Sequence, residues 1–235
     1  MGSRLSPLTK VTNKHLLPVY NNPIIFKVIR TLTYSGINEI TFVLGGESVG
    51  DIVRLLGDGS DFNARFNYVY QQQAGGIAEA LYLTKDIIKD QKIAVILGDN
   101  FFEDIFTTEI DEFQNTSDYE CCLFLKQVDN PERFGVAELN NNGSIKMVQE
   151  KPTYPKSNYV VTGFYLYDEN IFKVIEQVIN DIGYSNRGEL EITDVNNWYV
   201  ERGYMTYSLI EGFWSDAGTV DSLYTASTFA KLQSR

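Results

Sequence analysis

The sequence contains few of the residues that build metal centres and covalent cross-links. Its 235 residues include one histidine, His15, and two cysteines, Cys121 and Cys122, which are adjacent. The two cysteines exclude a disulfide framework and a four-cysteine zinc cluster, and the lone histidine excludes a multi-histidine metal site. A histidine-based catalytic triad is equally disfavoured. The pair falls in a predicted strand, so the two side chains point to opposite faces of the sheet. Core packing is the favoured role for both cysteines.

Long apolar runs and positive charge are also scarce. No segment approaches the roughly 20 apolar residues of a membrane helix, and residues 1–7 lack the apolar core of a signal peptide. An excess of 31 acidic over 20 basic residues gives a net charge of −11, which argues against a general nucleic-acid surface. A few local bases can still bind a small anion. We therefore expect a globular cytoplasmic protein with no membrane or nucleic-acid partner.

Strand and helix patterns alternate in the first half of the chain. The pattern predicts strands over 39–44, 66–70 and 93–97, and helices over 48–56, 77–83 and 105–114. The apolar run 93–97 is typical of a strand buried on both faces. Such alternation predicts an α/β fold with a mainly parallel sheet flanked by helices.

The second half has a different pattern. Strands are expected over 120–126, 135–139, 145–149 and 159–167, with a hairpin turn at 141–143, and helices return over 170–179, 190–201 and 219–231. This order predicts an antiparallel insert followed by a return to the sheet. No Pro/Ser-rich linker divides the chain, so we expect a single domain over 1–235.

Several residues are suited to holding an anion near the N-terminus. Gly2 allows backbone amides to approach an anion closely, Arg4 can form paired hydrogen bonds with phosphate oxygens, and Lys14 adds a point charge. Considered alone, Gly2 and Arg4 could instead belong to a basic N-terminus that is exposed to solvent. The segment 14–19, Lys-His-Leu-Leu-Pro-Val, favours a fixed lysine, with His15 as a partly exposed neighbour and not a ligand.

Polar groups recur at three later turns. Gln71 carries an amide that can read a base edge, and Gly76 leaves room for a flat base on the backbone. Asp99 follows the apolar strand at 93–97, at the end where open α/β sheets bind ligands. Asp216 precedes the last helix. Either aspartate could instead be a helix cap or a turn former.

Taken together, these motifs resemble the sugar-1-phosphate nucleotidyltransferases, in their short form. The resemblance runs almost end to end. It is carried by Gly-Ser-Arg-Leu at 2–5, Pro-Leu-Thr at 7–9, the segment 14–19, Gly-Asp-Gly at 57–59, Gly-Ile-Ala at 76–78, Leu-Gly-Asp-Asn at 97–100, Pro-Glu-Arg-Phe-Gly-Val at 131–136, Glu-Lys-Pro at 150–152, Val-Thr-Gly at 161–163, Arg-Gly-Glu-Leu-Glu-Ile-Thr-Asp at 187–194 and Trp-Ser-Asp-Ala-Gly-Thr at 214–219.

The resemblance implies transfer of a thymidylyl group from dTTP to α-D-glucose 1-phosphate, giving dTDP-glucose and pyrophosphate. It implies a Rossmann-like nucleotidyltransferase fold, with nucleotide binding in 1–118 and sugar binding in 119–235. The implied nucleotide-binding residues are Gly2, Ser3, Arg4, Gln71, Gly76 and Asp99. Asp99 and Asp216 match the Mg²⁺ ligands, and Mg²⁺ needs only one or two carboxylates beside phosphate oxygens and water.

The implied sugar-phosphate site is built from the second half. It comprises Gly135, Glu150, Lys151, Val161, Thr162 and Arg187. Glu150 would accept hydrogen bonds from sugar hydroxyls, and Lys151 would hold the phosphate for attack. The implied catalytic residues are Arg4, Lys14, Lys151, Asp99 and Asp216, which would act by positioning and charge neutralisation.

Three departures from the family pattern leave alternatives open. Glu79 stands where the family has glutamine, which puts one base contact in question. The family's first strand, expected at the centre of the sheet, is missing, so Met1 is interpreted as an internal methionine; a truncated, inactive chain is the alternative. The family's C-terminal effector helices are also absent.

The alternative functions are transfer from UTP or to another hexose 1-phosphate, and non-catalytic binding of a nucleotide sugar. Assembly into a homo-oligomer stays open.

Overall fold

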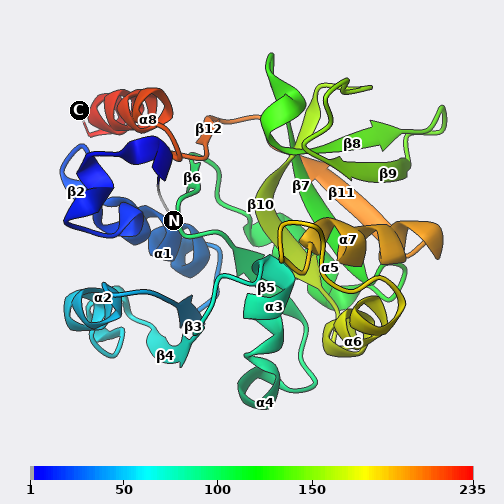
Figure 1. Ribbon diagram of the computed structural model, residues 1–235, viewed down its shortest axis with the longest axis horizontal. Coiled ribbons are helices and arrows are strands. Elements are labelled where there is room, and N and C mark those ends of the chain that lie inside the picture. The colour runs from blue at the N-terminus through cyan, green and yellow to red at the C-terminus, as the bar shows by residue number, and fades with distance from the viewer. Residues whose placement is uncertain (1–2, 235) are drawn as a thin grey trace.

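The computed structural model describes residues 3–234, apart from the side chain of Ser3, and shows an α/β molecule (Figure 1). The helices are α1 (Ile24–Tyr34), α2 (Val49–Leu56), α3 (Ile77–Tyr82), α4 (Lys85–Ile88), α5 (Thr107–Asn115), α6 (Ile171–Asp181), α7 (Ile192–Glu201) and α8 (Val220–Gln233). The strands are β1 (Pro18–Val19), β2 (Asn22–Pro23), β3 (Glu39–Leu44), β4 (Arg65–Tyr70), β5 (Ile93–Ile96), β6 (Phe101–Phe102), β7 (Cys121–Gln127), β8 (Gly135–Leu139), β9 (Ile145–Glu150), β10 (Tyr159–Tyr167), β11 (Met205–Leu209) and β12 (Trp214–Ser215).

The main sheet is mixed and is organised around the long strand β10. One edge of β10 pairs with β7, which in turn pairs in parallel with β11. The other edge pairs antiparallel with β5 and, farther along, with β8, which carries β9 as a hairpin partner. It follows that β5, β7, β8 and β11 run in one direction and β9 and β10 in the other. The α/β class, the flanking helices and the antiparallel insert that the sequence predicted are confirmed.

Alternation along β7 explains how helices cover both faces of the sheet. Cys121 packs in one core cluster with α6 and α7, and the next residue, Cys122, packs in a second cluster with α1. A third, smaller cluster joins α8 to Val19 and Phe101. The prediction that the adjacent cysteines are core residues on opposite faces is confirmed, and burial raises the pKa of the Cys122 thiol to about 12.

Strands β3 and β5 each have an unpaired edge in the described part of the chain. The parallel pair β3 and β4 forms a separate two-stranded sheet, and β5 pairs only with β10. Within residues 3–234, no strand pairs with the free edge of β3 or of β5. Both faces of β5 are covered, as expected: Ile93 and Val95 pack against one core cluster, and Ala94 and Ile96 against the other. All four residues nevertheless stay partly exposed. An apolar strand with one open edge keeps part of its surface in contact with solvent.

The helices of residues 3–234 include none that combines the length and the apolar character needed to cross a bilayer.

Candidate active site

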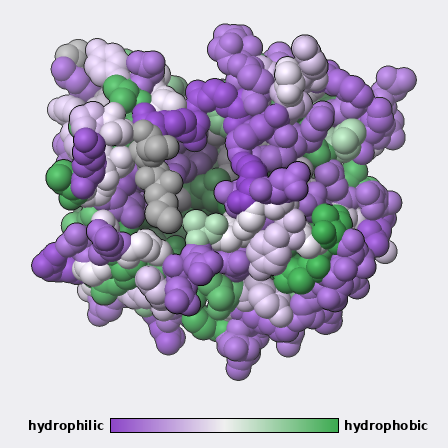
Figure 2. Space-filling model, in the orientation of Figure 1, coloured by the Kyte–Doolittle hydropathy of each residue, from purple (hydrophilic) through white to green (hydrophobic). Residues whose placement is uncertain are grey.

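A cavity lies between β5 and β8, which pair with different parts of the same edge of β10. Its floor includes Val161 and Thr162 of β10, and its walls include residues that follow β5 and precede or begin β8. The register of β10 against β7 shifts between Val161 and Tyr165. Leu97 stays tied to β10 through a hydrogen bond from its N–H to the Gly163 carbonyl (2.9 Å). Figure 2 shows a depression near the middle of this face, bordered largely by hydrophilic residues.

Most of the predicted site residues meet in this cavity. The lining includes Arg4, Asp99, Gly135, Glu150, Lys151, Val161, Thr162, Arg187 and Asp216, which come from segments spread over the whole chain. Lys14 joins the group through an ion pair with Asp99. Gly2 lies outside the described residues, and of Ser3 only the backbone is described, at the start of a single helical turn over Ser3–Leu5.

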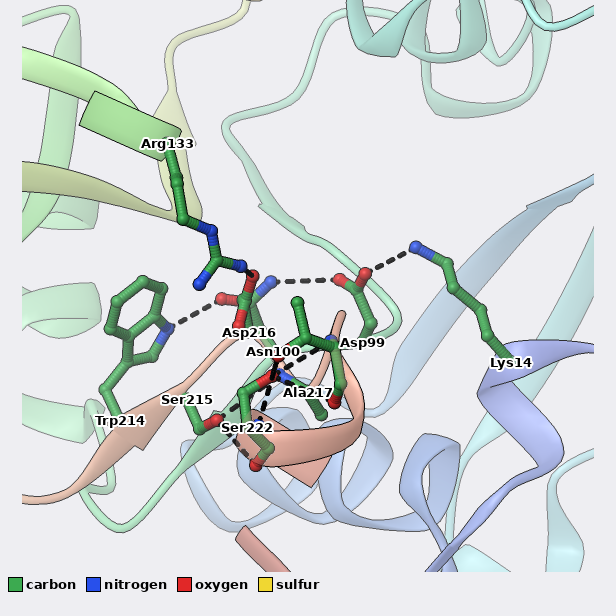
Figure 3. A network of polar contacts seen from close by, with 10 residues as sticks. Lys14, Asp99, Asn100, Arg133, Trp214, Ser215, Asp216, Ala217 and Ser222 are labelled. Carbon is green, nitrogen blue, oxygen red and sulfur yellow. Dashed lines mark hydrogen bonds and ion pairs between the residues drawn. The ribbon is translucent and has the colours of Figure 1, made fainter. Parts of the chain in front are cut away.

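Asp99 is held at the carboxyl end of β5 by two side chains. One carboxylate oxygen pairs with Lys14, and the other accepts a hydrogen bond from the Asn100 amide (3.2 Å) (Figure 3). Asn100 in turn accepts from the indole N–H of Trp214 (2.6 Å). Asp99 is therefore not a helix cap, and its side chain is tied to the segment that carries Asp216.

Asp216 lies just before α8 but does not cap it. The N-cap of α8 is Thr219, which forms a capping box with Ser222. The carboxylate of Asp216 accepts a hydrogen bond from the guanidinium of Arg133 (3.1 Å) (Figure 3). The second acidic group of the cavity is thus neutralised by a base, as the first is by Lys14.

The sugar-side residues form a third charged group. Glu150 accepts from the Lys151 ammonium (2.7 Å) and from the Thr193 hydroxyl (2.9 Å). Burial acts to raise the pKa of Glu150, but the hydrogen bonds from Lys151 and Thr193 and the charge of Arg187 outweigh it and lower that pKa. Arg187 pairs mainly with Glu191 (2.7 Å). Glu150 therefore stays ionised and able to accept hydrogen bonds.

Neither of the two predicted base-reading residues, Gln71 and Gly76, is among the residues that line the cavity. Gln71 follows β4, and Gly76 immediately precedes Ile77, which does line the cavity. Gly76 has a φ of +98°, and a Cβ there would lie 2.5 Å from the Leu190 carbonyl oxygen. Only glycine allows this close approach.

Sequence reasoning assigned no role to Arg133, Asn100 or Trp214, although all three line the cavity. Each lies inside a motif that the sequence analysis quoted, directly beside Phe134, Asp99 or Ser215. The available signal was nearness to a predicted site residue: Asn100 directly follows Asp99, and Arg133 and Trp214 lie two positions before Gly135 and Asp216. The groups of three or more acidic, histidine or cysteine side chains that a protein-only metal centre would need are not found among residues 3–234.

Comparisons with known proteins agree with this arrangement. The chain is 38% identical over 232 residues to a glucose-1-phosphate thymidylyltransferase of Neisseria meningitidis, covering 98% of this chain and 79% of that protein. A Mycobacterium tuberculosis protein of the same name is 35% identical over 237 residues, covering 100% and 80%.

Solved structures show the same fold. A Bacillus anthracis protein described as a glucose-1-phosphate thymidylyltransferase, in complex with sucrose, is 47% identical, with a TM-score of 0.91 over 98% of this chain and 91% of that one. A UDP-glucose pyrophosphorylase complexed with UDP-glucose is 22% identical, with a TM-score of 0.82 over 100% and 96%, and shares the fold. The model of the nucleotidyl transferase family matches residues 1–233. This chain belongs to the nucleotidyl transferase family.

Proposed function

We propose that the protein transfers a thymidylyl group from dTTP to α-D-glucose 1-phosphate, releasing pyrophosphate and dTDP-glucose. One observation carries this proposal: Arg133, Lys151 and Arg187 converge with Asp99 and Asp216 in a single cavity. Two anionic substrates repel each other, so a site that joins them needs several cations held in fixed positions. The names of the relatives supply the nucleotide and the sugar phosphate.

The chain offers separate residues for each substrate. Arg4 and Lys14 are proposed to bind the phosphates of the nucleotide and the departing pyrophosphate. Lys151 and Arg187 are proposed to hold the sugar phosphate, and Glu150 to accept hydrogen bonds from sugar hydroxyls. The Thr162 hydroxyl already donates to the Phe124 carbonyl (2.9 Å), so Thr162, like Gly135 and Val161, shapes the wall of the site.

The acidic pair fits a magnesium ion. Asp99 and Asp216 line the same cavity, and the partners of their carboxylates are two bases and one amide. Mg²⁺ takes one or two protein carboxylates and fills its remaining positions with phosphate oxygens and water. When bound, the ion would neutralise phosphate charge. Lys14 and Arg133, now paired with these acids, would then be available to the phosphates.

The reaction requires no nucleophilic side chain. An ionised oxygen of the sugar phosphate attacks the α-phosphorus of the nucleotide, one P–O bond forms, and the bond to the β-phosphate breaks. No proton has to be removed from the attacking oxygen. The protein's part is to align the two phosphates and to stabilise their charge, which suits a cavity with several cations and no histidine in its lining.

We further propose that residues 1–235 act as one nucleotidyltransferase domain, with 1–118 serving the nucleotide and 119–235 the sugar. This division rests on the cavity itself, whose lining draws on both halves. A cytoplasmic location and a homo-oligomer stay predictions.

The test is pyrophosphate release from dTTP and glucose 1-phosphate with Mg²⁺, with and without EDTA. We expect release by the wild-type protein, and a loss of at least about 100-fold in kcat/KM for Asp99→Asn and Lys151→Met. Glu138 forms an ion pair with Lys146 on the β8–β9 hairpin, away from the cavity. Glu138→Gln is therefore the control and should retain activity. Folded wild-type protein that binds dTDP-glucose without releasing pyrophosphate would contradict the proposal and favour a binding role.

A further inference from the structure

The carboxylate of Glu79, in the first turn of α3, is fixed by two hydrogen bonds. One oxygen accepts from the side-chain amide of Gln71 (3.0 Å), and the other accepts from the Tyr184 hydroxyl (3.1 Å). The carboxylate also folds back over Gly75, where an added Cβ would overlap it. Glu79 therefore has a defined position that depends on two other segments of the chain, the loop 71–75 and the segment with Tyr184.

This contact determines which way the Gln71 amide faces. A carboxylate only accepts hydrogen bonds, so the group that meets it must be the NH₂ of Gln71. The carbonyl oxygen of the same amide is then directed away from Glu79. Within the described part of the chain, that oxygen has no hydrogen-bond partner. It is an acceptor left for a ligand.

The backbone around Gln71 is well anchored. Its N–H donates to the Leu44 carbonyl (2.8 Å) at the end of β3, and the Leu190 N–H donates to the Gly75 carbonyl (2.7 Å). Gly76 and Ile77 then lead directly into the cavity wall. The oriented amide thus belongs to a loop that is held from two sides and leads into the wall of the proposed site.

We propose that Glu79 is a positioning residue for base recognition, which holds the Gln71 carbonyl oxygen toward a base that presents an N–H. The inference rests on the proposed function, in which Gln71 meets the nucleobase. Thymine and uracil carry a proton on N3 and can donate to this oxygen. Cytosine has an unprotonated N3, so two acceptors would face each other, and an unpaired acceptor in a desolvated contact is costly.

The experiment compares dTTP with dCTP as substrates and dTDP with dCDP as ligands in calorimetric titrations. Glu79→Leu is the informative variant, because leucine cannot accept a hydrogen bond and leaves the Gln71 amide free to turn, whereas glutamine, the residue that the family has here, could still accept from it. We expect the kcat/KM ratio of dTTP to dCTP, and the affinity ratio of dTDP to dCDP, to fall about tenfold, the effect of one hydrogen bond.

Tyr184→Phe is the matched control, because it removes a contact to Glu79 but leaves the carboxylate beside Gln71. Its ratios should stay within about twofold of the wild-type values. If Glu79→Leu does not fold, Glu79→Ala carries the same expectation. Unchanged ratios in a folded Glu79 variant would overturn the inference. A wild-type protein that binds dTDP in preference to dCDP but releases no pyrophosphate would instead overturn the proposed function and leave the positioning role standing.

Discussion

The side chain of Arg133 donates to Asp216, which we propose as a Mg²⁺ ligand. Arg133→Met removes a positive charge 3.1 Å from that carboxylate. Since like charges repel, the variant should bind Mn²⁺, as a probe for Mg²⁺, roughly three- to tenfold more tightly in the absence of nucleotide. Electron paramagnetic resonance of free Mn²⁺ measures this directly.

Arg202→Met is the control for that titration, because Arg202 lies beside Trp198 on the surface, away from the cavity. Its Mn²⁺ affinity should equal that of the wild-type protein. Unchanged or weaker binding in Arg133→Met would show that Arg133 does not compete with the ion for Asp216.

His15 is expected to make stability depend on pH. Burial, followed by the charge of Lys14, lowers the pKa of His15 from 6.5 to about 4, although Asp99 acts to raise it. Between these two values the unfolded chain binds a proton that the folded protein does not, so stability falls as the pH falls below about 6.5. Since His15 is the one histidine in the sequence, the effect can be isolated.

Urea unfolding at pH 7 and pH 5.5 provides the measurement. The wild-type protein should lose about 1 kcal/mol more than His15→Gln over this interval. Equal losses in the two proteins would mean that His15 titrates alike in the folded and unfolded states.

At the level of single residues, the sequence located side chains better than it located their partners. Asp99 could be predicted because a carboxylate after an apolar strand is a local pattern. The contact between Arg133 and Asp216 joins residues 83 positions apart, and no local pattern encodes it. The same holds for Glu79: the departure from the family was visible in the sequence, but its contact with Tyr184, 105 positions away, was not.

Among the elements, β10 determines the shape of the site. Gly163 sits at its irregular segment with a φ of +90°, and a Cβ there would lie 2.7 Å from Leu97 and 3.1 Å from the Asn100 amide. Gly163→Ala therefore combines backbone strain with a clash against the loop that carries Asp99. We expect a loss of about 2–3 kcal/mol in the free energy of unfolding and a lower kcat.

Gly143→Ala separates strain from clash. Gly143 has a φ of +85° in the turn between β8 and β9, and nothing lies within 4 Å of an added Cβ. This control should lose about 1 kcal/mol of stability by urea unfolding and keep its activity. If the two variants behaved alike, the clash with Leu97 and Asn100 would have no consequence.

Local periodicity predicted most of the elements, because each long helix and strand carries its own apolar pattern. The predicted strand at 135–139 coincides with β8, for example. The same reasoning missed α1, although this 11-residue helix has its own apolar face. It also missed β11, a five-residue strand whose parallel pairing with β7 links residues about 80 positions apart. The apolar run of β5 predicted that both of its faces are covered, but not its partial exposure, since exposure depends on which strands lie at its edges and its own sequence does not report them.

On the scale of the whole molecule, the N-terminal segment around β1 packs against the C-terminal helix α8. The N–H of Tyr20 donates to the hydroxyl of Ser227 on α8 (2.8 Å). Helix α8 also packs against β1 and follows the segment with Asp216 (Figure 1). The N-terminal segment with Lys14 and the C-terminal segment with Asp216 are thus fixed against the same helix.

Phe229 on α8 is the residue through which this arrangement can be tested. Its ring stacks on Phe213 (4.2 Å between centroids), three residues before Asp216, and meets the edge of Phe101 (6.0 Å), two residues after Asp99. Phe229→Ala should lose about 2 kcal/mol of stability, less than a fully buried phenylalanine because the ring is half-buried. It should also lower kcat/KM in assays run well below the unfolding temperature, because the segments that carry Asp99 and Asp216 lose a common support.

Tyr224→Ala is the control, because Tyr224 lies on the same helix and is 73% exposed. It should change neither stability nor kcat/KM. Wild-type turnover in a destabilised Phe229→Ala would mean that the loops after β5 and β12 hold Asp99 and Asp216 in place without help from α8.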